Sequence, residues 1–314
     1  MTRQIHKLAL PQTASLVSWA DGKPLAAITC GVLIGALLPR RWDLSLLAFR
    51  TRLSQTLRLR SIERWVEVLR NLAGKDVQHL ADNHLRTAKE VGWHRIRSIL
   101  HSARSNYEIQ LDGLEHLQQA LSEGHGAILW SMFFCGFTIP KEALWRAGIR
   151  VSHLSRQDHA APSRSWLGLR VIAPLFWRAE TPFLAKRVVM PLDGSLGYMR
   201  ELMGLLENNQ CISIFGELPA KRQNQGALFF GRMRNYATGA PALAARTGAA
   251  LLTVYTVREG PLRYRVVIEP PITVDRTANQ STFVQAAIEE FSTRIERQVM
   301  DHPTDWDGWA DFSN

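Results

Sequence analysis

The chain has 314 residues, of which 46% are hydrophobic, 21% charged and 9% aromatic, and this composition excludes disordered and fibrous classes. The formal net charge of +10 predicts attraction to an anionic partner: nucleic acid, anionic lipid or an acidic carrier protein. The cysteines Cys30, Cys135 and Cys211 are odd in number and share no CxxC spacing. This argues against a disulfide framework or a zinc site and fits a reducing compartment.

An apolar run at residues 25–38 is the first feature along the chain, and arginines from Arg40 to Arg70 follow it. The run is shorter than the ~20 residues that a bilayer-spanning helix needs. An apolar segment flanked by arginines is typical of a membrane interface, and a buried helix with a solvated arginine face explains it equally well. A secretory signal is disfavoured, because the run ends in Leu-Leu-Pro-Arg-Arg without a small-residue cleavage site.

Apolar residues recur at helical spacing from residue 44 to about 120. Together with the apolar run and its arginines, this spacing predicts a helical, membrane-docking portion over residues 1–120, followed by a second domain over 121–314. In that second domain, short apolar or alternating runs take turns with amphipathic stretches. The predicted strands are 127–130, 149–154, 211–215, 250–257 and 264–268, and the predicted helices are 139–147, 196–206, 238–246 and 284–300. Such alternation predicts an α/β fold with a mixed, mostly parallel sheet flanked by helices.

Three blocks of residues in the second domain carry a family resemblance. Residues 182–187 read Pro-Phe-Leu-Ala-Lys-Arg, and residues 214–222 read Ile-Phe-Gly-Glu-Leu-Pro-Ala-Lys-Arg. Residues 228–254 combine Leu-Phe-Phe-Gly, a small-residue run, and Thr-Gly-Ala before an apolar strand. Their order resembles that of the lysophospholipid acyltransferase superfamily, and most of all its lipid A acyltransferases, whose tryptophan-rich C-terminus is similar to 302–309.

The resemblance implies roles for several side chains. The first block implies that Lys186 and Arg187 contact the phosphate of the acceptor, a task for which a guanidinium suits because it forms two parallel hydrogen bonds. The second block implies that Glu217 positions the acceptor, with Arg222 adding to the phosphate contact. The alternatives are a basic pair on the surface, and a turn glutamate paired with Lys221 or Arg222.

The catalytic pair of that superfamily is missing from its expected place. There, a His-x4-Asp/Glu motif follows the first strand of the α/β domain, and the histidine takes the proton of the acceptor hydroxyl. Here Ser131 and Gly136 stand at the two positions. Neither residue is a general base.

Three explanations for this departure stay open. Another histidine, His125, His153 or His159, supplies the base. Alternatively, Ser131 or Cys135 takes the acyl group covalently, although an apolar setting makes a thiol inert. In the third explanation, the chain has lost transfer and binds acyl groups or lipids, or runs other chemistry on a carrier-bound substrate.

Other function classes lack their signatures in this sequence. No finger, RNP-like or helix-turn-helix pattern indicates nucleic acid, and no GxGxxG, P-loop, GxSxG or metal-ligand spacing occurs. The resemblance implies an acyltransferase without a metal or resident cofactor, whose donor is a thioester of acyl carrier protein or coenzyme A. It further implies a lipid-like acceptor with a hydroxyl or amine, and a place on the anionic cytoplasmic surface of the bacterial inner membrane.

Overall fold

The computed structural model describes residues 15–22, 25–26, 29, 83–84, 86–93, 107–136, 138–159, 161, 163–217, 223–274 and 279–309. Most of the apolar run at 25–38, the arginines behind it, Cys30 and Arg222 lie outside these residues. The membrane-docking role of residues 1–120 therefore stays a prediction. Within the described ranges, no helix is both long and apolar enough to cross a bilayer.

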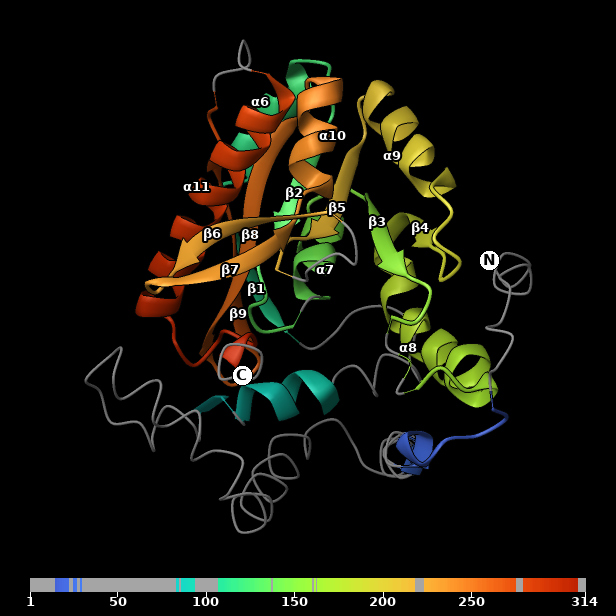
Figure 1. Ribbon diagram of the computed structural model, residues 1–314. Coiled ribbons are helices and arrows are strands. Elements are labelled where there is room, and N and C mark those ends of the chain that lie inside the picture. The colour runs from blue at the N-terminus through green and yellow to red at the C-terminus, as the bar shows by residue number, and fades with distance from the viewer. Residues whose placement is uncertain are drawn as a thin grey trace.

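A seven-stranded sheet forms the centre of the molecule, in the order β1-β9-β8-β2-β5-β3-β4 (Figure 1). Its strands are β1 (Glu108–Asp112), β2 (Ala127–Ser131), β3 (Val151–Arg156), β4 (Leu184–Met190), β5 (Cys211–Phe215), β8 (Ala250–Gly260) and β9 (Arg263–Pro271). The run from β8 to β4 is parallel, whereas β9 is antiparallel to β8 and β1 is parallel to β9. This confirms the predicted mixed, mostly parallel sheet.

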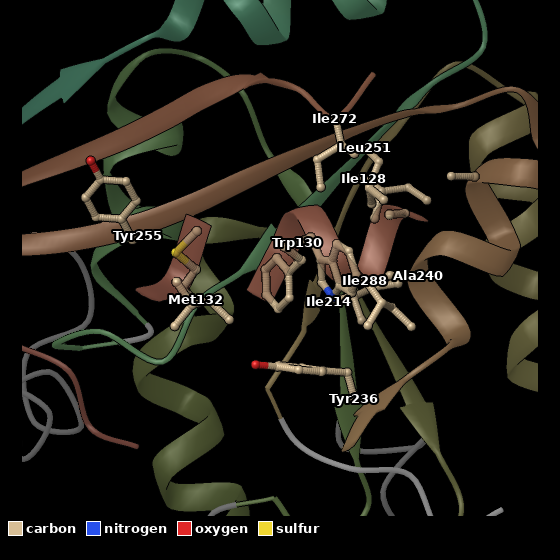
Figure 2. Packing of buried hydrophobic residues seen from close by; sticks show 14 of the residues in the cluster. Ile128, Trp130, Met132, Ile214, Tyr236, Ala240, Leu251, Tyr255, Ile272 and Ile288 are labelled. Atoms are coloured by element: carbon tan, nitrogen blue, oxygen red, sulfur yellow. The ribbon is translucent and has the colours of Figure 1, made fainter. Parts of the chain in front are cut away.

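Helices cover both faces of the sheet. Those with bounds in this part of the chain are α6 (Leu114–Ser122), α7 (Ile139–Arg146), α8 (Ala173–Glu180), α9 (Gly197–Glu207), α10 (Gly239–Thr247) and α11 (Gln280–Asp301). Side chains alternate along β2, so Ile128 and Trp130 pack with α9, α10 and α11, and Leu129 packs with α6 and α7. The Trp130 ring stacks on Phe291 of α11 with centroids 3.9 Å apart, which fixes the end of β2. Figure 2 shows Trp130 among the other buried side chains of this face, such as Ile214 and Tyr236.

Two features differ from the predicted organisation. The predicted boundary at residue 120 falls inside α6, and both β1 before it and α6 itself belong to the sheet and its helical cover. β1 is a short, half-exposed strand whose partner β9 lies far along the chain, so no local pattern marks it. A separate hairpin of β6 (Asn224–Phe229) and β7 (Arg232–Ala237) was also not predicted. It turns at Phe230 and Gly231, both at positive φ (49° and 73°), as tight hairpins prefer.

Candidate active site at the carboxyl ends of the central strands

The predicted site position lies where β2 and β5 end side by side. Ser131 is paired in register with Phe215, and these parallel strands end at the same edge of the sheet, where ligands of open α/β sheets bind. The Ser131 hydroxyl is half-buried and lies 3.4 Å from the Ser213 hydroxyl. The Gly216 N–H donates to the Ser131 carbonyl at 3.0 Å, which holds the two chain ends together.

Two glycines at this edge are required by their surroundings. Gly136 has a φ of +72°, and a Cβ there would lie 2.8 Å from Ile139 Cδ1. A carboxylate at this position would therefore strain the backbone and collide with α7. A Cβ on Gly216 would lie 2.3 Å from Phe291 Cζ and 2.4 Å from Trp130 Nε1. At both positions the sequence departs from the superfamily motifs by having a glycine. The close packing of nearby side chains explains why a glycine stands there.

Glu217 is a buried anchor between four segments of the chain. Its carboxylate accepts from the Phe133 N–H at 2.5 Å, the Trp306 Nε1–H at 2.9 Å and the Arg234 guanidinium at 3.1 Å. Burial raises the pKa of this carboxyl, and Arg234 opposes that rise. The Arg234 Cζ itself lies 4.8 to 5.4 Å from the centroids of three aromatic rings. Glu217 therefore connects the loop after β2, the strand β7 and the C-terminal tail, which an ordinary turn glutamate would not do.

The C-terminal tail runs beside the loop that follows β2. The Cys135 N–H donates to the Asp305 carbonyl at 2.8 Å, and the Asp307 N–H donates to the Phe133 carbonyl at 2.6 Å. Trp306, between the two aspartates, is fully buried and reaches Glu217. The tail thus brings two carboxyl groups to the edge of the sheet at which β2 and β5 end.

His84, which is distant from this tail in the sequence, contacts it. Its Nδ1 lies 2.9 Å from the carbonyl oxygen of Thr304, which is 220 positions further along the chain, and its Nε2 lies 4.0 Å from Asp307 Oδ1. Burial lowers the pKa of His84, and the bond to Thr304 opposes that shift. Burial, with Asp305 and Glu217 nearby, raises the pKa of Asp307 to about 7. No sequence motif links this histidine to this aspartate, because the two positions are too far apart in the chain for a local pattern.

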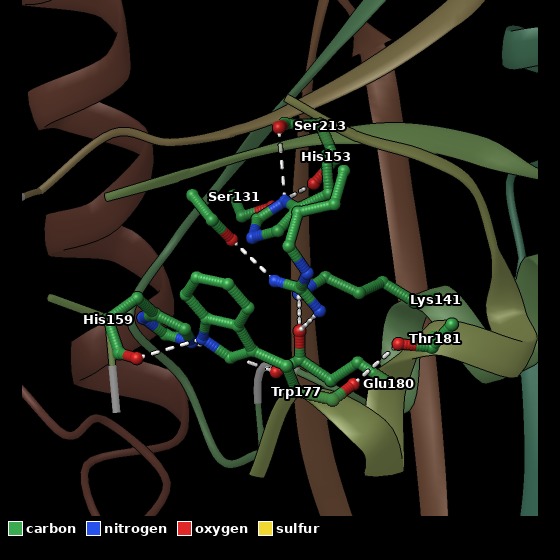
Figure 3. Close-up of polar contacts among 10 residues, drawn as sticks. Ser131, Lys141, His153, His159, Trp177, Glu180, Thr181 and Ser213 are labelled. Atoms are coloured by element: carbon green, nitrogen blue, oxygen red, sulfur yellow. Dashed lines mark hydrogen bonds and ion pairs between the residues drawn. The ribbon is translucent and has the colours of Figure 1, made fainter. Parts of the chain in front are cut away.

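A second polar cluster, centred on Glu180 at the end of α8, lies under the neighbouring strands (Figure 3). The fully buried Glu180 carboxylate lies 2.8 Å from Arg187, 3.5 Å from Lys141 and 3.7 Å from His159 Nε2. Burial opposes ionisation, but Lys141, His159 and Arg187 together hold the pKa of Glu180 well below its usual range. Arg187 also donates to the Ser155 hydroxyl at 2.6 Å.

The candidate histidines occupy three different settings. His153 is buried in β3 with Nδ1 3.1 Å from the Ser213 carbonyl oxygen, and burial, followed by Lys141, lowers its pKa well below 6.5. His159 belongs to the Glu180 cluster. His125 is exposed and precedes the first residue of β2, at the opposite edge of the sheet. The structure therefore separates His125 from Ser131 by the length of a strand.

Cys135 and the two cations of the first block lie apart from one another. The Cys135 thiol is buried, donates to the Thr256 carbonyl at 3.3 Å, and burial raises its pKa well above its usual value, so it stays protonated. Lys186 and Arg187 are neighbours on β4 and point to opposite faces. Lys186 pairs with Glu201 of α9 at 2.7 Å, and Arg187 pairs with Glu180. The two do not form one phosphate cradle.

The fold is an α/β sheet with a polar cluster at the carboxyl ends of its parallel strands, and comparison with known proteins gives the family. Residues 80–309 match the family of bacterial lipid A biosynthesis acyltransferases, and the chain belongs to that family. No curated protein matches the sequence. Among solved structures, the 1-acyl-sn-glycerophosphate (LPA) acyltransferase PlsC from Thermotoga maritima is similar at 11% identity and a TM-score of 0.37, covering 89% of this chain and 96% of that one. The assignment rests on the family match.

Proposed function

We propose that this chain transfers an acyl group from a thioester of acyl carrier protein or coenzyme A to a lipid-like acceptor that carries phosphate. The acceptor group is a hydroxyl or an amine, and the reaction takes place at the anionic cytoplasmic surface of the bacterial inner membrane. Membership of an acyltransferase family supports the general activity. Donor, acceptor and location are the finer parts of the proposal.

One observation carries it. The carboxylate of the second block, Glu217, is buried and held by three donors directly beside the strand end at Ser131. Burying the Glu217 carboxylate at this edge, with the partly exposed Arg234 as its counter-charge, costs desolvation energy, and this cost supports a working role for Glu217. We therefore propose that acyl transfer takes place at this edge of the sheet.

Direct transfer fits the geometry better than a covalent intermediate. Cys135 is buried and protonated, so its thiol is not available as a nucleophile. The Ser131 hydroxyl lies 3.4 Å from the Ser213 hydroxyl, which is no base that could activate it as a nucleophile. In direct transfer the acceptor oxygen loses its proton and attacks the thioester carbonyl, the C–S bond breaks, and the thiol leaves.

The phosphate of the acceptor is assigned to exposed cations. Lys186 is exposed, so exchange of Glu201 for a phosphate is open to it. Arg222 remains part of the proposal from the family resemblance. Arg187 is given a structural role, since its guanidinium is already bound to Glu180 and Ser155.

The test uses the full chain, thioesters of several acyl lengths on both carriers, and vesicles that contain anionic phospholipid with or without lysophospholipid or lipid A precursor. Released thiol and the intact mass of the protein are measured together. Acceptor-dependent thiol release with unmodified protein is the expected result. A protein adduct would replace direct transfer by a covalent route. Absence of thiol release with every donor would overturn the proposed activity.

A second candidate function rests on Gly136. Because this position excludes the carboxylate of the superfamily, an acyl- or lipid-binding protein without transfer is the alternative. It predicts saturable binding of acyl thioesters, measured by calorimetry, with no release of thiol. Turnover in the same samples would remove it.

A further inference from the structure

We propose that His84 and Asp307 form the acid–base pair of this site, with His84 as the base that takes the proton of the acceptor and Asp307 as the carboxylate that stabilises the resulting imidazolium. The inference rests on the proposed acyl transfer and assigns its missing base. The two residues are more than two hundred positions apart in the chain and meet at the edge where β2 ends.

Backbone contacts place Asp307 beside the strand end. Its N–H donates to the Phe133 carbonyl at 2.6 Å, while the Phe133 N–H donates to Glu217. Phe133 is two residues beyond Ser131, which corresponds to roughly 7 Å of extended chain. The pair thus lies at the same edge as the vacant motif position and Glu217.

The hydrogen bond of His84 determines which of its nitrogens is basic. A carbonyl oxygen only accepts, so the Nδ1 at 2.9 Å from the Thr304 carbonyl carries the proton. The neutral imidazole then has its lone pair on Nε2, the atom 4.0 Å from Asp307 Oδ1. Because burial lowers the pKa of His84, the ring is neutral at neutral pH and ready to accept a proton.

Both side chains of the pair are partly exposed. The side chains of His84 and Asp307 are 17% and 31% exposed, whereas His153 is 1% exposed. The charged groups that face the pair are the carboxyls of Glu217 and Asp305, with Arg234 on the former and the Arg258 N–H donating to the latter at 3.0 Å. Burial, with Asp305 and Glu217, raises the pKa of Asp307, and the ionised form of Asp307 is the one that stabilises an imidazolium at His84.

The step balances without a further reactant. His84 Nε2 takes the proton of the acceptor hydroxyl as its oxygen bonds to the thioester carbonyl carbon. The C–S bond then breaks, and the departing sulfur takes the proton from the imidazolium to leave as a thiol. The products are the acyl ester and the free thiol, and His84 returns to its neutral form.

The rival pair, His159 and Glu180, is less suited to this step. Its atoms are 3.7 Å apart, but Arg187 and Lys141 already share the Glu180 carboxylate at 2.8 Å and 3.5 Å. These two cations already compensate the negative charge of Glu180, which would otherwise stabilise an imidazolium at His159. His159 would become positive next to two positive side chains.

His84→Asn is the variant that tests the base, because an asparagine amide keeps a donor for the Thr304 carbonyl and removes Nε2. We expect thiol release under single-turnover conditions to fall by about 100-fold or more, the usual contribution of a general base. His116→Asn is the matched control. His116 is in α6, and its Nδ1 makes the same kind of bond, at 3.0 Å from the Ile268 carbonyl oxygen. Wild-type rates in His84→Asn would overturn the inference.

Two further measurements separate catalysis from folding. Asp307→Asn should shift the acidic limb of the kcat/KM profile to lower pH, because the imidazolium of His84 loses its stabilising charge; a merely structural residue would leave the limb in place. Added imidazole should restore part of the activity of His84→Gly. An unchanged limb together with absent rescue would overturn the pair. An inactive wild-type protein would instead overturn the proposed function, so the two failures are distinct.

Discussion

The Glu180 cluster and the cluster of Glu217, Asp307 and His84 are two histidine–carboxylate regions with opposite charge balance. In the first, Arg187 and Lys141 surround one buried carboxylate and hold its pKa low. In the second, carboxyl groups outnumber the cations, Arg234 and Arg258, and the pKa of Asp307 rises to about 7. Proximity of a histidine to a carboxylate therefore does not make a base. The sign of the surrounding charge decides whether the imidazolium is tolerated.

Removal of Arg187 should have the largest effect on stability. Arg187→Ala leaves Glu180 buried without its closest partner, and breaking such a pair costs about 3–5 kcal/mol. Lys186→Ala is the control on the same strand, because its pair with Glu201 is half-exposed and contributes at most about 1 kcal/mol. Urea unfolding of both variants measures the difference. An equal loss of unfolding free energy in both variants would show that the Glu180 ion pair contributes no more to stability than the half-exposed pair of Lys186.

Glu217→Gln should lower stability by less, and activity by more. The amide oxygen still accepts from the Phe133 N–H, but Arg234 loses its counter-charge, which corresponds to about 1.5–3 kcal/mol. Glu201→Gln is the control, since it removes a carboxylate of the same type at the surface. Urea unfolding and thiol release are measured on both variants. A Glu217→Gln protein with full activity would remove Glu217 from the site.

The raised pKa of Asp307 predicts a pH dependence of stability. Between the ordinary value of 3.8 and the folded value of about 7, the folded protein binds more protons at Asp307 than the unfolded chain does. Its contribution to the free energy of unfolding therefore falls as pH rises through this window. Asp305 acts in the same direction, with a pKa of about 6, and the lowered pKa of His84 acts in the opposite one.

Comparison of the wild type with Asp307→Asn isolates that contribution. We expect the variant to gain stability relative to the wild type as pH rises from 4 to 7. Chemical unfolding of both proteins at each pH measures this gain. A difference between the two proteins that is constant over this range would show that Asp307 titrates normally in the folded state.

Alkylation of Cys135 should show the smallest effect. Its thiol is buried and protonated, so iodoacetamide should leave the peptide that contains Cys135 unmodified in the folded protein and modify it after unfolding in urea. Peptide mass spectrometry reads both states. Rapid labelling of the folded protein would place this thiol within reach of an acyl donor and would revive the covalent route.

Local patterns in the sequence were sufficient for much of the fold. The strand at 211–215 was predicted with its observed bounds, and the helix at 139–147 was predicted within one residue, because apolar runs and Gly148 mark them. The order of the blocks led to the superfamily, which the family match confirms. These features depend on residues close together in the chain.

The sequence by itself determined the fold class, the family and the absence of a base at position 131. Only the tertiary structure decided that Lys186 and Arg187 point apart, that Glu217 is held by Trp306, and that His84 meets Asp307. Each of these depends on contacts between distant segments, and such contacts follow from packing of the whole chain. A histidine and an aspartate more than two hundred residues apart carry no shared local signal, so their pairing became visible only in the folded molecule.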